Sequence, residues 1–398
     1  MILVARSSLA TLTATLALYL PLAAQTAPPQ VSTRSGLELQ FSGLVLLNGF
    51  YNSDAVNNSD VPLYASRPDT TSTFPASGLG GTARQSRLML VVTAPDVLGA
   101  TMSGELDVDF FGGQEPSTGG RFFPLLRIRR TRLDLWWTHV NVMIGQEVPL
   151  IAEVNPRSLA SIGIPGFAGA GNLWFWIPQA RVGVETGATV RFGLDGAVLA
   201  PSSYEAQSNE FTTQPDIAER SGRPSVEARG RIGWTGESTS GEVSIGGHLG
   251  WLATDGDSLL ESKAAAASVR LRPLRAIELR GEVYTGEGVA GLGTGAIGQN
   301  FGLNGIPIRT TAWWAQLNLL PSDAWELGGG FGIDDPKDED IDPASQRSKN
   351  TVWEVHAAWR PLPLVVGLEF RRLETEYGAN PNWTWSASQA NLALGFEF

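Results

Sequence analysis

Apolar and polar side chains alternate along the chain in segments of about ten residues. In the segment TMSGELDVDF, Leu106 and Val108 share one face, whereas Glu105, Asp107 and Asp109 share the other. Because successive side chains of a β-strand point to opposite sides, each such segment is predicted to be a strand with one apolar and one polar face.

Sixteen segments of this kind begin near residues 37, 82, 99, 125, 140, 179, 188, 225, 241, 263, 276, 311, 324, 351, 363 and 386. Short turns, such as APDVLG and RPLR, alternate with long polar connections throughout. A soluble β-sandwich, the alternative all-β fold, has no reason to place every short turn at one end. An outer-membrane barrel has short periplasmic turns, long extracellular loops and an even number of strands. The predicted fold is therefore all-β: a closed transmembrane antiparallel β-barrel of about 16 strands.

The composition agrees with a folded membrane barrel. Hydrophobic residues make up 42% of the chain, cysteine is absent, and the net charge of -11 argues against a nucleic-acid partner. The tryptophan-rich stretches LWWTHV, LWFWIP, TAWWAQ and PNWTWS lie at expected strand ends. They predict a girdle at the membrane interface, with core filling as the alternative.

The first residues predict export. Arg6 precedes an apolar stretch that ends in small residues, which indicates a cleaved signal peptide over 1–24, with an uncleaved anchor as the alternative. A short N-terminal segment over 25–35 and the barrel over 36–398 follow. The apolar stretch is short for a membrane-spanning helix.

The chain ends in ANLALGFEF, a strand whose alternating apolar residues continue to the last position. Together with the signal peptide and the sixteen segments, this ending resembles the Gram-negative outer-membrane porins. In that family the closing strand and its terminal aromatic are read by the barrel-assembly machinery, and Leu394, Phe396 and Phe398 match that signal. This strand is expected to pair with the first one, LELQFSGLVL, and so to close the barrel.

A narrower resemblance, to the DcaP-like trimeric porins, rests on ARQSRL, GELDVDFFGG, RIRRTRLDLWW, IGQEVPL and PQARVGVE. It implies a homotrimer in the cell outer membrane that contacts lipid and lipopolysaccharide. It also implies a passive diffusion channel without cofactors, with an arginine-rich constriction that favours small anions such as dicarboxylates.

The segment LLRIRRTRLDL is the richest in arginine. Arg127 and Arg129 share one phase of the alternation, whereas Arg130 and Arg132 share the other, so a β-bulge at Arg129–Arg130 is predicted. Without the bulge two arginines would face hydrocarbon, at about 2–4 kcal/mol each near the midplane. The residues expected to line the pore and set its selectivity are Arg127, Arg129, Arg130, Arg132, Glu105, Asp107, Asp109, Arg181, Arg229 and Arg231. The alternative is that these charges only neutralise one another and solvate the lumen.

The connection over 146–172 is rich in Gly, Ala and Pro and is apolar, unlike an exposed loop. It is interpreted as a constriction loop that folds into the lumen, with Glu147, Glu153 and Arg157 at the eyelet. The alternative, a latch on a neighbouring subunit, is compatible with this interpretation.

Catalysis receives little support. The three histidines, His139, His248 and His356, lie in separate segments, and no HExxH, GxSxG or Walker motif is present. No catalytic residue, metal site or cofactor is therefore predicted. The acidic run over 334–343 lacks the spacing of an EF-hand and is expected to be a solvated external loop, with ion bridging to lipopolysaccharide as the alternative. A non-selective porin, a barrel adhesin and an outer-membrane enzyme remain the alternative functions.

Overall fold

A computed structural model describes residues 30–32, 36–113, 122, 124–205, 213–254 and 258–398. The predicted signal peptide over 1–24 lies outside the described residues. No helix within the described ranges is both long and apolar enough to cross a membrane.

The described residues form one sheet. Its strands are β1 (Gln30–Ser32), β2 (Glu38–Asn52), β3 (Gly78–Thr82), β4 (Arg87–Val97), β5 (Ala100–Asp109), β6 (Arg127–Trp136), β7 (Val140–Glu147), β8 (Ile177–Gly187), β9 (Val190–Leu199), β10 (Ser225–Thr235), β11 (Ser240–Ala253), β12 (Leu259–Leu274), β13 (Ile277–Glu287), β14 (Arg309–Ser322), β15 (Trp325–Pro336), β16 (Arg347–Trp359), β17 (Leu364–Tyr377) and β18 (Asn380–Glu397). Helical turns lie at η2 (Glu219–Ser221), η3 (Ala290–Leu292), α1 (Gly295–Gly298), η4 (Leu303–Gly305) and η5 (Asp338–Asp340).

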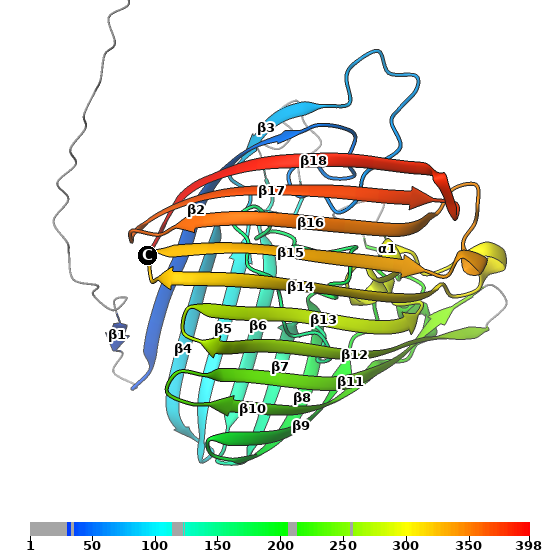
Figure 1. The fold of residues 1–398 in the computed structure, drawn as a ribbon. Coiled ribbons are helices and arrows are strands. Elements are labelled where there is room, and N and C mark those ends of the chain that lie inside the picture. The colour runs from blue at the N-terminus through cyan, green and yellow to red at the C-terminus, as the bar shows by residue number, and fades with distance from the viewer. Residues whose placement is uncertain (1–29, 33–35, 114–121, 123, 206–212, 255–257) are drawn as a thin grey trace, which may run out of the picture.

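The sheet closes on itself, as predicted. Strands β2 and β4–β18 form a wall of sixteen antiparallel strands, in which each pairs with its neighbours along the chain. The last strand pairs with the first, with Leu394 opposite Leu47 and Phe396 opposite Val45. Closure leaves every strand of the wall with a partner on both sides (Figure 1).

Short turns gather at one end of the barrel and longer connections at the other (Figure 1). Two connections at the loop end contradict the predicted alternation. The β17–β18 connection is only Gly378–Ala379, and the β11–β12 connection spans five residues, 254–258. The predicted start of the last strand near 386 was also wrong, because β18 begins at Asn380 and PNWTWS lies within it. Because β18 extends beyond the bilayer, its first residues take the place of the longer loop that was expected between β17 and β18.

The outer face is apolar around the barrel. Exposed residues include Phe41 on β2, Ile144 on β7, Ile245 on β11 and Leu368 on β17. The inner face carries most of the buried polar and charged side chains. This inversion of the soluble pattern is typical of a barrel that meets lipid outside and water inside.

The predicted tryptophan girdle is only partly correct. Trp136 and Trp313 are 49% and 41% exposed on the outer face, but Trp174, Trp176 and Trp314 are buried inside the barrel. LWFWIP is the end of the loop that enters the lumen, and Trp314 stacks on Phe167 of that loop. Alternation reverses the direction of Trp313 and Trp314, so one tryptophan of the pair faces lipid and the other faces the lumen.

The wall strand that follows β2 in the chain is split into two pieces, β3 and β4. β3 pairs with the loop-side half of β2 and β4 pairs with the other half, so residues 83–86 leave the ladder between them. Arg84 and Gln85 in this break are buried and turn inward.

One side of the lumen is filled by chain that folds inward. Leu150, Ile151 and Leu173 of the β7–β8 connection pack against Tyr284 on β13 in an apolar cluster that also contains Val289. The connection over 288–308, expected to be polar, therefore also enters the barrel.

Candidate functional site: the narrowed lumen

The predicted bulge lies on β6. Arg130 is opposite Asp107 and Ile128 is opposite Val108, so Arg129 is the extra residue in the ladder. As a result Ile128 is 49% exposed on the outer face, whereas Arg129 is buried inside. The prediction of a bulge at Arg129–Arg130 is confirmed.

Two inner-face carboxylates on β5 hold the loop-side end of the arginine row. Arg127 Nη2 and Arg129 Nη1 lie 2.6 and 3.0 Å from Asp109 Oδ2. Arg87 on β4 binds Asp107 through two atoms, Nε at 2.5 Å and Nη2 at 2.6 Å. Both carboxylates are completely buried, so these pairs are geometrically fixed.

The other two arginines of β6 share two glutamates. Arg130 Nη2 lies 2.5 Å and Arg132 Nη2 3.3 Å from the carboxylate of Glu105. Glu147 Oε2 lies 2.9 Å from Arg132 Nη1 and 3.5 Å from Arg130 Nη1. Each arginine of the row therefore has an acidic partner, and the row is largely compensated in charge.

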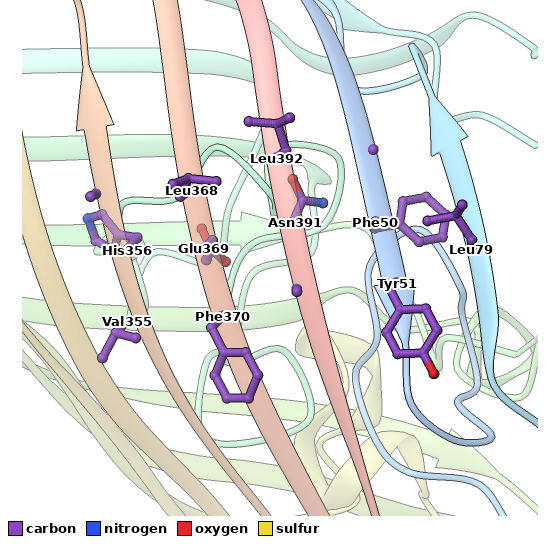
Figure 2. Close-up of a pocket in the computed structure, with 13 residues that line it drawn as sticks. Phe50, Tyr51, Leu79, Val355, His356, Leu368, Glu369, Phe370, Asn391 and Leu392 are labelled. Carbon is purple, nitrogen blue, oxygen red and sulfur yellow. The ribbon is translucent and has the colours of Figure 1, made fainter. Parts of the chain in front are cut away.

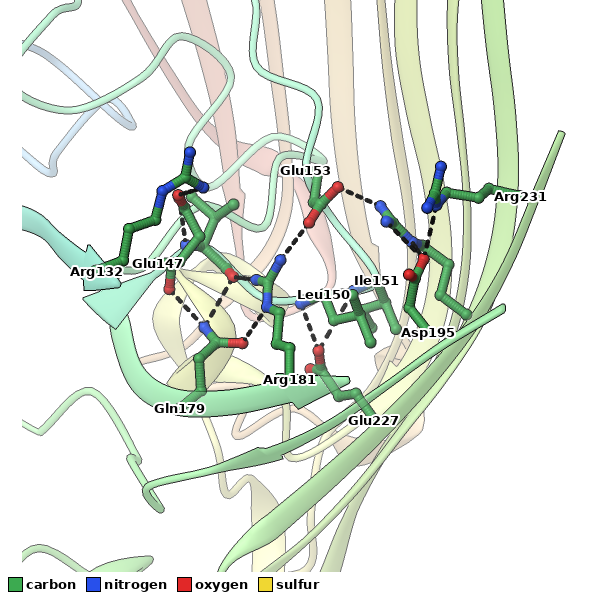
Figure 3. Close-up of polar contacts among 12 residues, drawn as sticks. Arg132, Glu147, Leu150, Ile151, Glu153, Gln179, Arg181, Asp195, Glu227 and Arg231 are labelled. Atoms are coloured by element: carbon green, nitrogen blue, oxygen red, sulfur yellow. Dashed lines mark hydrogen bonds and ion pairs between the residues drawn. The ribbon is translucent and has the colours of Figure 1, made fainter. Parts of the chain in front are cut away.

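The remaining predicted arginines meet at a residue of the lumen loop. Glu153 forms ion pairs with both Arg181 on β8 and Arg229 on β10 (Figure 3). Asp195 Oδ2 lies 2.9 Å from Arg229 Nη2 and 2.8 Å from Arg231 Nε. Burial raises the pKa of the Glu153 carboxyl, but Arg229 and Arg181 outweigh burial and hold this pKa below its ordinary value.

Arg157 anchors the loop to strands β13 and β15 of the barrel wall. Its Nε lies 2.7 Å from Glu278 Oε1 on β13, and its Nη1 lies 3.0 Å from Glu326 Oε2 on β15. Its backbone N–H donates to Gln316 Oε1 at 2.8 Å, and its carbonyl accepts from Gln316 Nε2 at 2.8 Å. The loop therefore lies inside its own barrel, as interpreted from its composition, and little of it is exposed to act as a latch.

The break in the second wall strand also holds the loop, which sequence reasoning missed. Gln85 Nε2 donates to the carbonyl of Ala160 at 2.9 Å, and Gln85 Oε1 accepts from the N–H of Ile162 at 2.7 Å. Asn48 Nδ2 donates to the carbonyl of Leu159 at 2.9 Å. No sequence signal identifies partners that lie 77 or 111 residues apart.

A cavity of about 340 Å³ remains beside the loop. Its charged lining consists of Arg87, Arg129, Arg130, Arg157, Arg360, Glu147, Glu153 and Glu326. It thus brings together two of the four arginines of β6 and all three predicted eyelet residues. Arginines of β4 and β6 and Glu326 of β15 both line it, and Glu326 pairs with Arg157 at 3.0 Å, so the lining holds charges of both signs.

A carboxylate, an imidazole and a hydroxyl meet on the inner face of β10–β12. Glu227 Oε1 lies 2.9 Å from His248 Nδ1, and Ser262 Oγ lies 3.5 Å from His248 Nε2. All three side chains are buried, and Glu227 Oε2 accepts the N–H of Leu150 at 2.6 Å. A Cβ added at Gly250 would lie 3.1 Å from His248 Nε2, so the imidazole is closely packed. This arrangement is an anchor for the loop and leaves no room for a substrate beside the hydroxyl.

The acidic run over 334–343 is not entirely a solvated external loop. Asp334 and Asp340 are buried, which contradicts the expectation for these two residues. Asp340 pairs with Arg309 at 2.7 Å, and this hydrogen-bonded guanidinium lowers the pKa of Asp340. Within the described part of the chain, no group of His, Asp or Glu side chains is placed to hold a metal ion.

The terminal strand presents its predicted apolar face outward. Leu394, Phe396 and Phe398 are 44–47% exposed, and the Phe398 ring lies 5.6 Å from that of Phe41. The Phe398 carbonyl accepts the N–H of Gly43 at 2.9 Å, so the last residue belongs to the closed wall.

A second concavity, of about 730 Å³, lies on the outer face over β16–β18, β2 and β3 (Figure 2). Leu368, Tyr51 and Leu79 are exposed there, whereas His356 and Glu369 are buried toward the lumen. Its lining is apolar, which fits lipid or another apolar surface and not a polar solute.

The comparisons with known proteins agree on the fold. No protein-family model and no curated protein matches the chain. Among solved structures, the outer membrane channel DcaP of Acinetobacter baumannii has a TM-score of 0.70 at 15% identity, over 92% of this chain and 99% of that one. An anion-selective porin from Comamonas acidovorans gives 0.57 at 13% identity, over 91% and 100%. The trimer form of OmpT of Vibrio cholerae gives 0.51 at 9% identity, over 91% and 99%.

These likenesses define the class of fold: the chain has the sixteen-stranded barrel of the outer-membrane porins. The similarity to DcaP extends over nearly the full length of both chains.

Proposed function

We propose that this protein is a passive diffusion channel for small hydrophilic solutes in the outer membrane of a Gram-negative bacterium. The observation that carries the proposal is the segment over 148–176, which is held inside a closed barrel and narrows a charged lumen. Side chains alone cannot fill the interior of a sixteen-stranded barrel, so the space beside the loop is aqueous. The similarity to a solved outer membrane channel supports the same function.

We further propose a mild preference for small anions such as dicarboxylates. Five arginines and three glutamates line the cavity beside the loop. Guanidinium groups offer planar pairs of donors to carboxylates and remain charged at all physiological pH values. Because every arginine of the β6 row has an acidic partner, the field is moderate, and a non-selective porin is the alternative.

The remaining proposals concern assembly. We propose that a signal peptide over 1–24 directs export, that the barrel-assembly machinery reads Leu394, Phe396 and Phe398, and that the protein forms a homotrimer among lipid and lipopolysaccharide. The apolar outer face supports insertion in lipid. The trimer form of a structurally similar protein supports the oligomeric state.

An outer-membrane enzyme is the candidate from another class, favoured only by the contact series Glu227, His248 and Ser262. These three side chains are closely packed and leave no room for a substrate, which argues against enzymatic turnover. An adhesin would place its recognition surface in long external loops, whereas two connections at this end are only two and five residues long.

Reconstitution into planar bilayers tests the proposed function. Stepwise increases in conductance are expected, together with a reversal potential on the anion-selective side in a KCl gradient. Replacing Arg130 by Gln should shift this potential toward cation selectivity, whereas Arg372→Gln, on the outer face, should leave it unchanged. The absence of conductance steps would contradict the channel, and a cation-selective wild type would contradict the anion preference.

A further inference from the structure

A second charged cavity, of about 430 Å³, lies in the lumen at the short-turn end of β9–β13. Its charged lining consists of Arg191, Arg270, Arg272, Arg280, Glu242 and Glu278. None of these residues belongs to the arginine row of β6 or to the cavity beside the loop. The four arginines outnumber the two glutamates, so the lining carries an excess of positive charge.

Arg191 pairs with Glu185 at 3.4 Å, but the carboxylates of the lining compensate the other three arginines only in part. Glu278 is shared by three guanidinium groups, with Nε of Arg157 at 2.7 Å, of Arg272 at 2.8 Å and of Arg280 at 2.5 Å. The ion pair found for Glu242 is with Arg231, at 4.0 Å. One shared carboxylate cannot neutralise three arginines, whereas the four arginines of β6 share several carboxylates, among them Asp109, Glu105 and Glu147.

Arg270 is the unusual member of the group. It is exposed, and within the described ranges its side chain forms no hydrogen bond or ion pair. It lies directly opposite Arg280 in the register of β12 and β13. Side chains in such pairs have Cβ atoms about 5 Å apart, and like charges placed there destabilise a sheet. The wall therefore holds two adjacent guanidinium groups. Arg280 is paired with Glu278 at 2.5 Å, whereas Glu242, opposite Arg270 on β11, forms no ion pair with it within the described part of the chain.

Space for a ligand exists beside this pair. Gly233 on β10 faces the lumen. In the register of the sheet it lies opposite Arg191 on β9 and opposite Glu242 on β11. A Cβ added at position 233 would lie 3.5 Å from Arg191 Nη2 and 3.7 Å from Glu242 Oε2, so these two side chains, which line the cavity, lie over the glycine. Arg191 faces the gap from one side and Arg270 lies one strand beyond Glu242 on the other.

We propose that this cavity is a binding station for a small dianion, such as a dicarboxylate or inorganic phosphate. Two neighbouring guanidinium groups present parallel donors that suit either ligand. The proposal rests on the proposed channel function and adds to it a second anion site, at the short-turn mouth. A dianion there takes the place of the missing carboxylate partner of Arg270 and relieves its repulsion with Arg280.

Block of channel current tests the proposal. Wild-type protein in planar bilayers is titrated with succinate, inorganic phosphate or acetate at constant ionic strength, and the half-blocking concentration is measured. Succinate and phosphate are expected to block at concentrations at least about tenfold below acetate, since a charge-assisted hydrogen bond contributes about 1.5–3 kcal/mol. Equal potency of acetate, or no block by either dianion, would overturn the proposal.

Arg270→Gln is the informative variant because Arg270 holds no structural contact. Its half-blocking concentration for succinate is expected to rise about tenfold, with normal conductance steps as proof of folding. The matched control is Arg275→Gln, which removes the same charge from the adjacent turn outside the cavity and should change the value less than twofold. An unchanged Arg270→Gln, or an equal change in both variants, contradicts the site. If the wild-type protein produced no conductance steps at all, that result would instead contradict the channel function.

Discussion

Arg157 on the lumen loop and Glu278 on β13 form an ion pair of 2.7 Å between residues 121 positions apart in the chain. The loop leaves the wall at β7 and returns at β8, so this pair ties its middle to a distant part of the barrel. Glu278 is nearly fully buried, whereas Arg157 is partly exposed to the cavity. The width of the lumen therefore depends on a side-chain contact.

Arg157→Ala should release the middle of the loop and raise the single-channel conductance. The barrel should still form, because Glu278 keeps Arg272 and Arg280 as partners. A loss of about 1–3 kcal/mol in unfolding free energy is expected for the broken charge-assisted hydrogen bonds. Conductance steps of wild-type size in this variant would show that the loop does not need Arg157.

Glu153 should make the stability of the loop depend on pH. Its pKa in the folded protein lies below the ordinary value, so its ion pairs stabilise the fold above the unfolded-state pKa. This contribution is lost as the pH falls through the folded-state pKa. Thermal unfolding measured from pH 7 down to pH 3 should therefore show a fall in wild-type stability that is reduced in Glu153→Gln. Parallel curves for the two proteins would rule out this role.

The bulge on β6 gives a matched pair of deletions. Removing Arg129 should restore unbroken alternation, with Arg127 and Arg130 inward and Ile128 outward, so the barrel should assemble. Removing Ile128 instead should place an arginine on the lipid face, at about 2–4 kcal/mol near the midplane. Folding yield into lipid vesicles, read as heat-modifiable mobility on gels, compares the two. Equal yields would mean that the phase of β6 is not set by the bulge.

Ser262 should be unreactive. Its hydroxyl is buried and lies 3.5 Å from His248 Nε2, too far for a strong hydrogen bond. A fluorophosphonate probe is expected to leave the folded protein unlabelled, as it leaves Ser262→Ala. Stoichiometric labelling of the wild type alone would instead favour the enzyme alternative.

Much of the wall could be predicted from the sequence, because alternation with period two reports directly which residues face lipid. The slip of phase between Arg129 and Arg130 was visible for the same reason. The composition of 146–172 also indicated a buried loop. In each case the signal lies within one segment of chain.

The contacts inside the lumen could not be predicted, because each joins segments that are far apart in sequence. Alternation indicates that Gln85 or Glu278 faces inward but not which loop atom it meets. Trp174 was assigned to the interface because aromatic residues suit both a girdle and a packed interior. Arg270 could have been found from its phase in ASVRLRPL, but its lack of a carboxylate partner appears only when β11–β13 are assembled.

The most direct measurement uses the absence of cysteine from the chain. Ser158 lies on the loop and lines the cavity, whereas Ala265 is exposed on the outer face of β12. A negatively charged methanethiosulfonate reagent applied to Ser158→Cys in a planar bilayer should reduce the conductance of each channel, and Ala265→Cys should be unaffected. If the current through Ser158→Cys is unchanged after complete modification, solutes do not pass beside the loop, and the central claim is wrong.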